Sequence, residues 1–440
     1  MRYYSTRKRA EPATFARAAL SGLAPDGGLY VPEDIPPCRA AVKTSLPTMS
    51  FLDIAFETLR PFMDADLSDG ALRDLCAGAF TFDAPLRLIR EAPCGPPVRR
   101  ILELFHGPTA AFKDFGARFM ARMFSYLRRG ADKPLDILVA TSGDTGGAVA
   151  AGFSGVDGVR VTVLYPQGRV SPLQEKQIAG LGGNIFALAV QGSFDDCQRL
   201  VKAAFACAPL REKLDLSSAN SINIARLLPQ AVYHCAGAAA FLRAAPSAAP
   251  SAVLSVPSGN FGNLVAGLYA QAMGAPIARF IAATNINKTI PDYLESGVYR
   301  ARHSEPTISN AMDVGDPSNY ERLAAHWTID QLRALVSGAH ASDEETRQTI
   351  RAVHTRTGRI LDPHSAVAWK AADALIERGA VDRKNVIVLG TAHPAKFAGT
   401  VEPLVGPIPV PPQLAGAEGL KAHSRVISAS GEALLDALLG

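Results

Sequence analysis

The sequence predicts an α/β protein in which helices cover both faces of a mostly parallel sheet. Short runs of apolar and β-branched residues occur at 135–141, 159–165, 251–256 and 384–389, and they alternate with segments of helical apolar spacing. Each run ends in a loop of small or polar residues. Because ligands of such folds bind beyond the carboxyl ends of the strands, we expect the functional site at these loops.

Length and composition indicate a well-packed protein with more than one domain. A chain of 440 residues is too long for one ordinary core, so two or three domains are expected. The net charge of +4, from 45 basic and 41 acidic residues, is too small to predict binding to nucleic acid or to an anionic membrane. No run of about 18 apolar residues occurs, so no membrane span is predicted.

The six cysteines predict neither a disulfide framework nor a metal site. They are scattered along the chain, and none forms a Cys-x-x-Cys pair. The first residues lack the apolar core of a signal peptide. Both features suit a reducing compartment, so we expect a cytoplasmic protein that binds no metal.

Residues 1 to about 90 have the appearance of a separate unit. The segment 22–32 is rich in turn-forming residues, and two prolines follow at 36–37. From residue 50 to about 80 the apolar residues have helical spacing. No nucleophile and base occur together here, so we interpret this unit as a cap that packs against the rest of the chain.

The stretch from residue 106 to 116 carries the first catalytic candidate. It reads His-Gly-Pro-Thr-Ala-Ala-Phe-Lys-Asp-Phe-Gly, between an apolar run at 100–105 and an amphipathic segment at 117–124. Lys113 therefore falls in the first turn of a helix, where the helix dipole disfavours a second positive charge. A lysine kept from water there has a lowered pKa and can be a nucleophilic amine at neutral pH. A surface lysine at a helix start is the alternative.

The loop Pro-Ser-Gly-Asn-Phe-Gly-Asn at 257–263 is a candidate phosphate cradle. Gly259 and Gly262 let the backbone approach a ligand, and the helix that follows adds its dipole. The loop contains neither Gly-Lys-Ser/Thr nor Gly-x-Gly-x-x-Gly, so it favours a small phosphate-bearing cofactor over a nucleotide. A plain tight turn is the alternative.

The loop Ser-Gly-Asp-Thr-Gly at 142–146 places three side-chain oxygens at a predicted helix N-terminus, which suits a carboxylate ligand. The alternative is that Ser142 or Asp144 only caps the helix. In the same way, Arg226 and Asn223 share a face at the start of a long helical segment that follows Asn-Ser at 220–221. This arrangement suits a second phosphate. A capped helix with an exposed arginine is the alternative.

Two histidines near the C-terminal strand are interpreted as structural. His364 stands in Asp-Pro-His-Ser, and His393 stands in Thr-Ala-His-Pro. A functional role for either histidine is the alternative.

Together these motifs resemble the threonine synthase family, which uses pyridoxal phosphate. The segments that carry the resemblance are 26–30, 106–116, 140–146, 171–177, 181–184, 220–224, 257–263, 282–285 and 389–394. They follow one another along nearly the whole chain, and the resemblance is weakest in the last thirty residues. It implies a fold type II architecture of the tryptophan-synthase-β group, with two open, twisted, mostly parallel sheets, flanking helices and an N-terminal cap domain.

The resemblance also implies a division into domains. Residues 1–90 would be the cap, residues 126–215 a small α/β domain, and residues 91–125 together with 216–440 the large cofactor-binding domain.

The resemblance assigns roles to particular residues. Lys113 would hold pyridoxal 5′-phosphate as a Schiff base, and Thr391 would face the pyridine nitrogen, where a neutral hydroxyl makes a weaker electron sink than a carboxylate. The cofactor's phosphate would be bound by one loop, made of Ser258, Gly259, Asn260, Phe261, Gly262 and Asn263. The substrate would be bound through its carboxylate by Ser142 and Thr145 and through its phosphate by Asn220, Ser221 and Arg226.

One residue departs from the wider fold group. Asp144 stands where many relatives have an asparagine that reaches the cofactor's 3′-oxygen. An ionised aspartate accepts hydrogen bonds but cannot donate one. The resemblance therefore leaves the contact between Asp144 and the cofactor open.

The implied reaction converts O-phospho-L-homoserine and water to L-threonine and phosphate, so a small-molecule substrate is expected. Serine/threonine dehydratases and O-acetylserine sulfhydrylases are alternatives, but they need no second phosphate site and lack an N-terminal unit of this kind. A catalytically inactive binding protein is a third alternative, against which the presence of Lys113, Gly259 and Gly262 argues. A monomer or a homodimer is expected.

Overall fold

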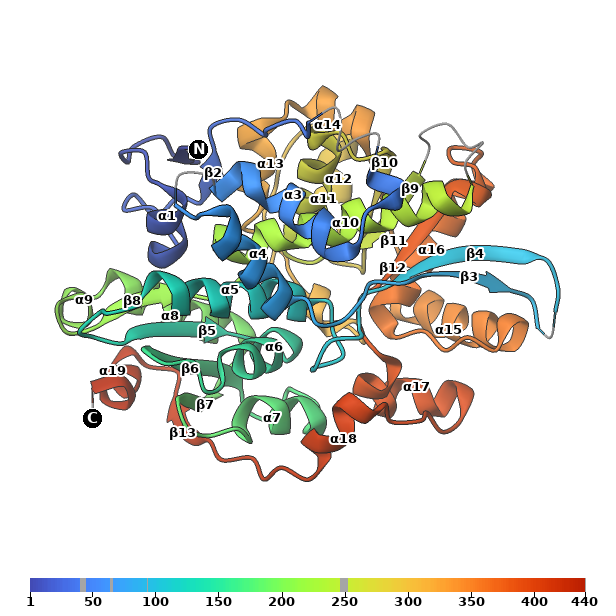
Figure 1. The fold of residues 1–440 in the computed structure, drawn as a ribbon. Coiled ribbons are helices and arrows are strands. Elements are labelled where there is room, and N and C mark those ends of the chain that lie inside the picture. Colours follow the sequence, from blue (N-terminus) through green and yellow to red (C-terminus); the bar gives the residue numbers. More distant parts are fainter. Residues whose placement is uncertain (40–44, 64–65, 93, 246–251, 440) are drawn as a thin grey trace.

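The computed structural model describes residues 1–439 except 40–44, 64–65, 93 and 246–251. Residue 251, which the sequence assigned to a strand, lies outside the described residues. Two separate sheets dominate the fold, with helices on their faces (Figure 1). The α/β architecture predicted from the sequence is confirmed.

Within the described residues the larger sheet has six strands, and one of them is antiparallel to its neighbour. In order across the sheet they are β11 (Val336–His340), β10 (Ile277–Thr284), β9 (Ala252–Pro257), β12 (Val386–Gly390), β4 (Pro97–Glu103) and β3 (Leu86–Arg90). The edge strand β3 runs antiparallel to β4, and the other pairs are parallel. All side chains of β9 and β12 are buried, as expected for parallel strands covered on both faces.

The smaller sheet has five strands, all parallel. Their order is β13 (Arg425–Ser428), β7 (Ile185–Gln191), β6 (Val159–Pro166), β5 (Leu135–Ala140) and β8 (Asp215–Ser218).

Helix α10 runs through the middle of the molecule, where it packs against α3, α5 and α11 (Figure 1). In the part of the chain that the structure describes, no helix is long and apolar enough to cross a membrane. The α-helices are α1 (Phe15–Ser21), α3 (Phe51–Met63), α4 (Asp69–Ala79), α5 (Lys113–Leu127), α6 (Asp144–Phe153), α7 (Pro172–Ala179), α8 (Phe194–Ala206), α9 (Ala208–Lys213), α10 (Ile224–Ala244), α11 (Gly262–Met273), α12 (Thr289–Ser296), α13 (Tyr320–His326), α14 (Ile329–Leu335), α15 (Asp343–Thr357), α16 (Pro363–Glu377), α17 (Ala398–Val405), α18 (Pro412–Glu418) and α19 (Gly431–Leu439).

The N-terminal segment contains a two-stranded antiparallel sheet of β1 (Tyr3–Ser5) and β2 (Tyr30–Pro32). The helical spacing read from 50 to 80 corresponds to two helices, α3 and α4, and the Ser68 hydroxyl caps the second of them. Arg322 of α13 holds this unit against the interior. Its fully buried guanidinium donates to the carbonyls of Tyr30, Ser221 and Ile222.

Strands β3 and β13 lie in sheets other than those that the predicted division of the chain implies. Strand β3 belongs to the six-stranded sheet, although residues 1–90 were assigned to the cap. Strand β13 pairs with β7 in the five-stranded sheet, although residues 216–440 were assigned to the large domain. The chain after α18 runs back beneath the molecule to reach β7, and α19 then packs on α8 (Figure 1).

Parallel pairing brings the catalytic candidates to one end of the strands. Within the larger sheet Leu389 is aligned with Leu102, and Val388 is aligned with both Ile101 and Ser255. The loops that leave β4, β9 and β12 therefore emerge side by side. In the smaller sheet β5 and β8 are neighbours in the same way.

Candidate active site

One pocket collects the residues that the sequence singled out. It is lined by Lys113, Ser142, Asp144, Thr145, Asn220, Ser221, Arg226, Ser258, Gly259, Asn260, Phe261, Gly262, Asn263 and Thr391. These residues follow β4, β5, β8, β9 and β12, so both sheets contribute. The expectation of a site beyond the carboxyl ends of the strands is met.

Lys113 is the first residue of α5, as predicted. Its side chain is half-buried in the pocket, and its Nζ lies 4.9 Å from the centre of the Phe112 ring. Burial lowers the pKa of Lys113 to about 8; the positive charges of Lys396 and Arg226 act in the same direction, and the negative charge of Asp144 acts against them. The amine is therefore far more available as a nucleophile and base near neutral pH than that of an exposed lysine.

The candidate phosphate cradle is built as a turn that enters α11. Phe261 occupies the left-handed region with φ +60° and is the N-cap residue, but its side chain makes no capping hydrogen bond. None of the backbone N–H groups from Gly259 to Asn263 donates a hydrogen bond to another described residue. Free N–H groups at a helix N-terminus form an anion-binding site.

Gly259 is required by the packing of this cradle. A Cβ there would lie 2.8 Å from the carbonyl oxygen of Ala311 and 2.8 Å from Cα of Met312. We therefore expect Gly259→Ala to displace the loop and weaken pyridoxal phosphate binding roughly tenfold or more, because overpacking shifts the backbone. Titration of the apoprotein with the cofactor, followed by visible absorbance, measures the dissociation constant. Gly399→Ala, where a Cβ meets nothing within 4 Å, is the control; equal affinities for the two variants would contradict this prediction.

The hydrogen-bond partners of Asn263 determine the orientation of its side-chain amide. Nε2 of His234 lies 3.0 Å from the carbonyl oxygen of Asn263 and 2.9 Å from its Oδ1. Since a carbonyl only accepts, Nε2 carries the proton, and the atom that faces it must be Oδ1. Tyr233 also donates to Oδ1, at 2.8 Å. Nδ2 is consequently turned away, and it is buried without a partner among the described residues.

Arg226 supplies a second donor that has no acceptor. Its Nη1 donates to the carbonyl of Ala219 at 2.6 Å, whereas its Nε is buried without a hydrogen-bond partner in the described chain. Burial lowers the pKa of Arg226 to about 10, so the guanidinium remains charged at neutral pH. Asn223, not Asn220 or Ser221, is the N-cap of α10, where its side chain accepts from the N–H of Ala225.

Asn220 is engaged in a way that the sequence did not indicate. Its Nδ2 donates to the carbonyl of Ala140 at 2.8 Å, and its Oδ1 accepts from the N–H of the same residue at 3.3 Å. The amide thus extends the pairing between β8 and β5 and positions the loop at 142–146. Ser221 accepts from Asn260 at 2.6 Å, which joins this corner to the cradle.

Neither Ser142 nor Asp144 caps α6, so the capping alternative is not what the structure shows. The N-cap is Gly143, with φ 137°, and the hydroxyl of Thr141 accepts the N–H groups of Gly143 and Gly146. Ser142 and Thr145 line the pocket.

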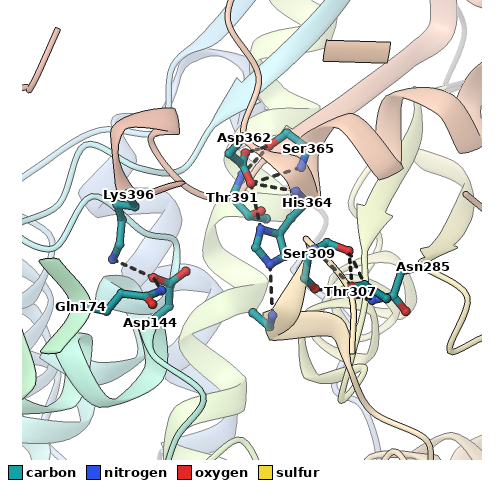
Figure 2. Close-up of polar contacts among 11 residues, drawn as sticks. Asp144, Gln174, Asn285, Thr307, Ser309, Asp362, His364, Ser365, Thr391 and Lys396 are labelled. Atoms are coloured by element: carbon teal, nitrogen blue, oxygen red, sulfur yellow. Dashed lines mark hydrogen bonds and ion pairs between the residues drawn. The ribbon is translucent and has the colours of Figure 1, made fainter. Parts of the chain in front are cut away.

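His364 combines a structural role with a place at the pocket wall. Its Nε2 accepts from the N–H of Ala311 at 3.2 Å, so the ring proton lies on Nδ1, which is 3.0 Å from Oδ1 of Asp362 (Figure 2). These hydrogen bonds fit the structural interpretation of His364, which stays a prediction, because the ring also lines the pocket and holds the segment 310–314 in place.

The sequence reasoning missed part of the pocket wall. Residues 310–314 line it, as do Phe194 and Gln198 of α8. The segment is held by a polar cluster in which Asn285 donates to Thr307 at 2.8 Å (Figure 2). Asn285 also donates to Asp313 at 2.8 Å. The sequence pointed to this part of the pocket wall only through Asn285, which ends the motif at 282–285. Its hydrogen-bond partners lie in a stretch of the chain without periodicity, so no pattern predicted them.

The pocket fits a phosphate-bearing cofactor that is bound covalently by an amine. It offers free backbone N–H groups, the buried Nδ2 of Asn263 and a lysine with a lowered pKa. Thr391, 4% exposed, adds a hydroxyl at the pocket wall. The fold and this pocket define a fold type II pyridoxal-phosphate enzyme.

Comparisons with known proteins give the family. Residues 87–391 match the model of pyridoxal-phosphate dependent enzymes, residues 2–80 the threonine synthase N terminus, and residues 365–437 the threonine synthase C-terminal region. Threonine synthase of Serratia marcescens is 42% identical over 100% of this chain and 99% of its own length. Threonine synthase of Escherichia coli K12 is 41% identical over 99% of this chain and 98% of its own length. The chain belongs to the threonine synthase family.

Solved structures agree with this assignment. The crystal structure of threonine synthase from Escherichia coli has a TM-score of 0.90 at 40% identity and covers 100% of this chain and 99% of that one. A pyridoxal-phosphate-bound threonine synthase from Brucella melitensis has a TM-score of 0.88 at 36% identity, with 100% and 98% covered. A threonine deaminase from tomato, at 16% identity and TM-score 0.55, shares the fold alone.

Proposed function

We propose that this chain converts O-phospho-L-homoserine and water to L-threonine and phosphate. The observation that carries the proposal is that two sets of donors without a partner among the described residues line one pocket together with Lys113. The cradle at 258–263 suits the cofactor's phosphate, and the corner formed by Ser221 and Arg226 suits a second one. A phosphorylated substrate needs both sites.

The residues that would hold the cofactor follow from this arrangement. Lys113 would bind it covalently, the N–H groups of residues 259–263 would bind its phosphate, and Thr391 would contact its ring nitrogen. When bound, pyridoxal phosphate supplies an electron sink for a substrate carbanion.

Lys113 would also move protons. In its neutral form its side chain would accept the substrate's α-proton, which the lowered pKa favours near neutral pH. Ser142 and Thr145 would orient the substrate through its carboxylate. Loss of a β-proton from the substrate would expel the γ-phosphate, which Arg226 and Ser221 would bind and stabilise as the leaving group. The elimination forms a carbon–carbon double bond, to which water would then add at the β-carbon.

The other members of the fold class remain the principal alternative. Dehydratases and O-acetylserine sulfhydrylases act on substrates without a phosphate, and such substrates would leave the charge of Arg226 unmatched. We further propose a cytoplasmic location, with a monomer or a homodimer as the working unit, and we retain the cap, small-domain and large-domain division with β3 and β13 reassigned.

An assay of the purified protein tests the proposal. We expect a visible absorption band with pyridoxal phosphate that changes when O-phosphohomoserine is added, with release of threonine and phosphate in equal amounts. Serine, threonine, and O-acetylserine with sulfide are the comparison substrates. Turnover of one of these but not of O-phosphohomoserine would place the protein among the dehydratases or sulfhydrylases, and no band at all would favour an inactive homologue.

A further inference from the structure

A buried ion pair stands at the wall of the cofactor pocket. Nζ of Lys396 lies 2.8 Å from Oδ1 of Asp144, and the side chains are 0% and 4% exposed (Figure 2). Lys396 lies on the short 3-10 helix η4 (Pro394–Phe397), five residues after Thr391. Buried charges of this kind are stable only when paired.

The neighbours of this pair fix its orientation. Gln174 accepts from the N–H of Ser171 through Oε1, so its Nε2 faces Oδ1 of Asp144, at 3.0 Å. Nζ of Lys396 also donates to the carbonyl of Thr109 at 2.8 Å. Thr109 is itself held by Asp114, which accepts from its N–H and its hydroxyl. The ion pair is therefore connected to the loop that leads to Lys113.

Asp144 faces the pocket, and Lys396 does not. Asp144 is among the residues that line the pocket, whereas its partners Lys396 and Gln174 are not. Asp144 begins α6, beside the smaller sheet, and Lys396 follows β12 of the larger sheet. The pair thus connects elements that belong to the two sheets on either side of the pocket.

We propose that Lys396 is a positioning residue of the cofactor site, which keeps Asp144 an ionised carboxylate and holds α6 against the larger sheet. Asp144 is then only an acceptor toward the bound cofactor, where an asparagine amide could also donate. The proposal depends on pyridoxal phosphate occupying the pocket but not on the identity of the substrate.

The charges around Asp144 support this role. Burial alone would raise the pKa of Asp144, but the positive charges of Lys396 and Lys113 and the hydrogen bond from Lys396 hold it well below its usual range. The hydrogen bond from Gln174 adds no charge. Without Lys396, one of the compensating charges is lost, and the buried carboxyl should take up a proton at a much higher pH.

Lys396→Met tests this inference in the holoenzyme without substrate. We expect its visible absorption band to show one pH-dependent transition between pH 5 and 9 that the wild-type protein lacks. We also expect roughly tenfold weaker cofactor binding, the effect of losing a charged hydrogen bond. Lys396→Arg should abolish the new transition, because it keeps the charge.

The control is Lys370→Met, which removes a half-exposed lysine 3.8 Å from Glu345 on the surface. It should behave as the wild type does. A Lys396→Met holoenzyme whose band and cofactor affinity match the wild type across this pH range would overturn the proposal, whatever the substrate proves to be.

A second pair of variants keeps the test decisive if Lys396→Met does not fold. If Lys396 acts through Asp144, the cofactor dissociation constants of Asp144→Asn and of the double variant Asp144→Asn/Lys396→Met should lie within about twofold of each other. The reason is that removing the second member of a coupled pair has little further effect. The double variant contains neither buried charge of the pair. A further tenfold loss in the double variant would show that Lys396 acts independently of Asp144.

Discussion

Lys113→Ala is expected to abolish turnover of O-phosphohomoserine, with a loss of about 10⁴-fold or more. Loss of a general base alone costs about 10²–10⁴-fold, and this variant also loses the amine that binds the cofactor covalently. The anion cradle is left intact, so the protein should still bind pyridoxal phosphate, but noncovalently. Reduction with borohydride should attach the cofactor to wild-type protein and not to the variant.

The pKa of Lys113 gives this prediction a pH dependence. Cofactor capture by the apoprotein requires a neutral amine, and its rate should rise with pH to a plateau above about 8, following the lowered pKa. With an ordinary lysine the rate would keep rising beyond pH 10, and the neutral fraction of the amine at pH 7 would be roughly 300-fold smaller. Stopped-flow absorbance measures the rate. Lys370→Ala is the control, and a midpoint above pH 10 would contradict the pocket geometry.

Local patterns predicted the elements that position the site, because their information lies within a few residues. A buried run such as β5 and the helix start at Lys113 are encoded by apolar spacing and by small loop residues. The short strand β13 is different. It pairs with β7 across more than 230 residues of sequence, with Val426 aligned to Ala189, and most of its side chains are exposed. No local periodicity could have predicted that pairing.

In the site, residue types were predictable and individual hydrogen bonds were not. Asn220, Ser221 and Asn223 are all residue types that can cap a helix N-terminus. Asn223 is the N-cap of α10, whereas the amide of Asn220 is hydrogen-bonded to the backbone of Ala140, a contact that no local pattern predicts. Lys396 carried no signal, because lysine is almost never fully buried. Only the fold brings it to Asp144. The structure gives Asp144 a specific partner in Lys396, and a contact between Asp144 and the cofactor stays a prediction.

Arg226→Gln should separate recognition of the substrate from binding of the cofactor. Among the described residues the buried Nε of the arginine has no hydrogen-bond partner, and the arginine lines the pocket together with Ser221 and residues 259–263. A lost hydrogen bond to a charged group costs about 1.5–3 kcal/mol, so kcat/KM for O-phosphohomoserine should fall roughly 10- to 100-fold. The affinity for pyridoxal phosphate should change by less than about threefold, and inhibition by inorganic phosphate should weaken by the same factor as kcat/KM, since both depend on one anion site.

The matched control lies on the same helix. Arg243, near the C-terminal end of α10, donates to the carbonyl of Pro47 at the surface, and Arg243→Gln should leave all three quantities unchanged. If Arg226→Gln weakened cofactor binding and substrate turnover equally, the arginine would belong to the cofactor's phosphate site, and the pocket would contain one anion site where we propose two. The argument for a phosphorylated substrate would then fail, while the lysine and the cradle would still define a pyridoxal-phosphate enzyme.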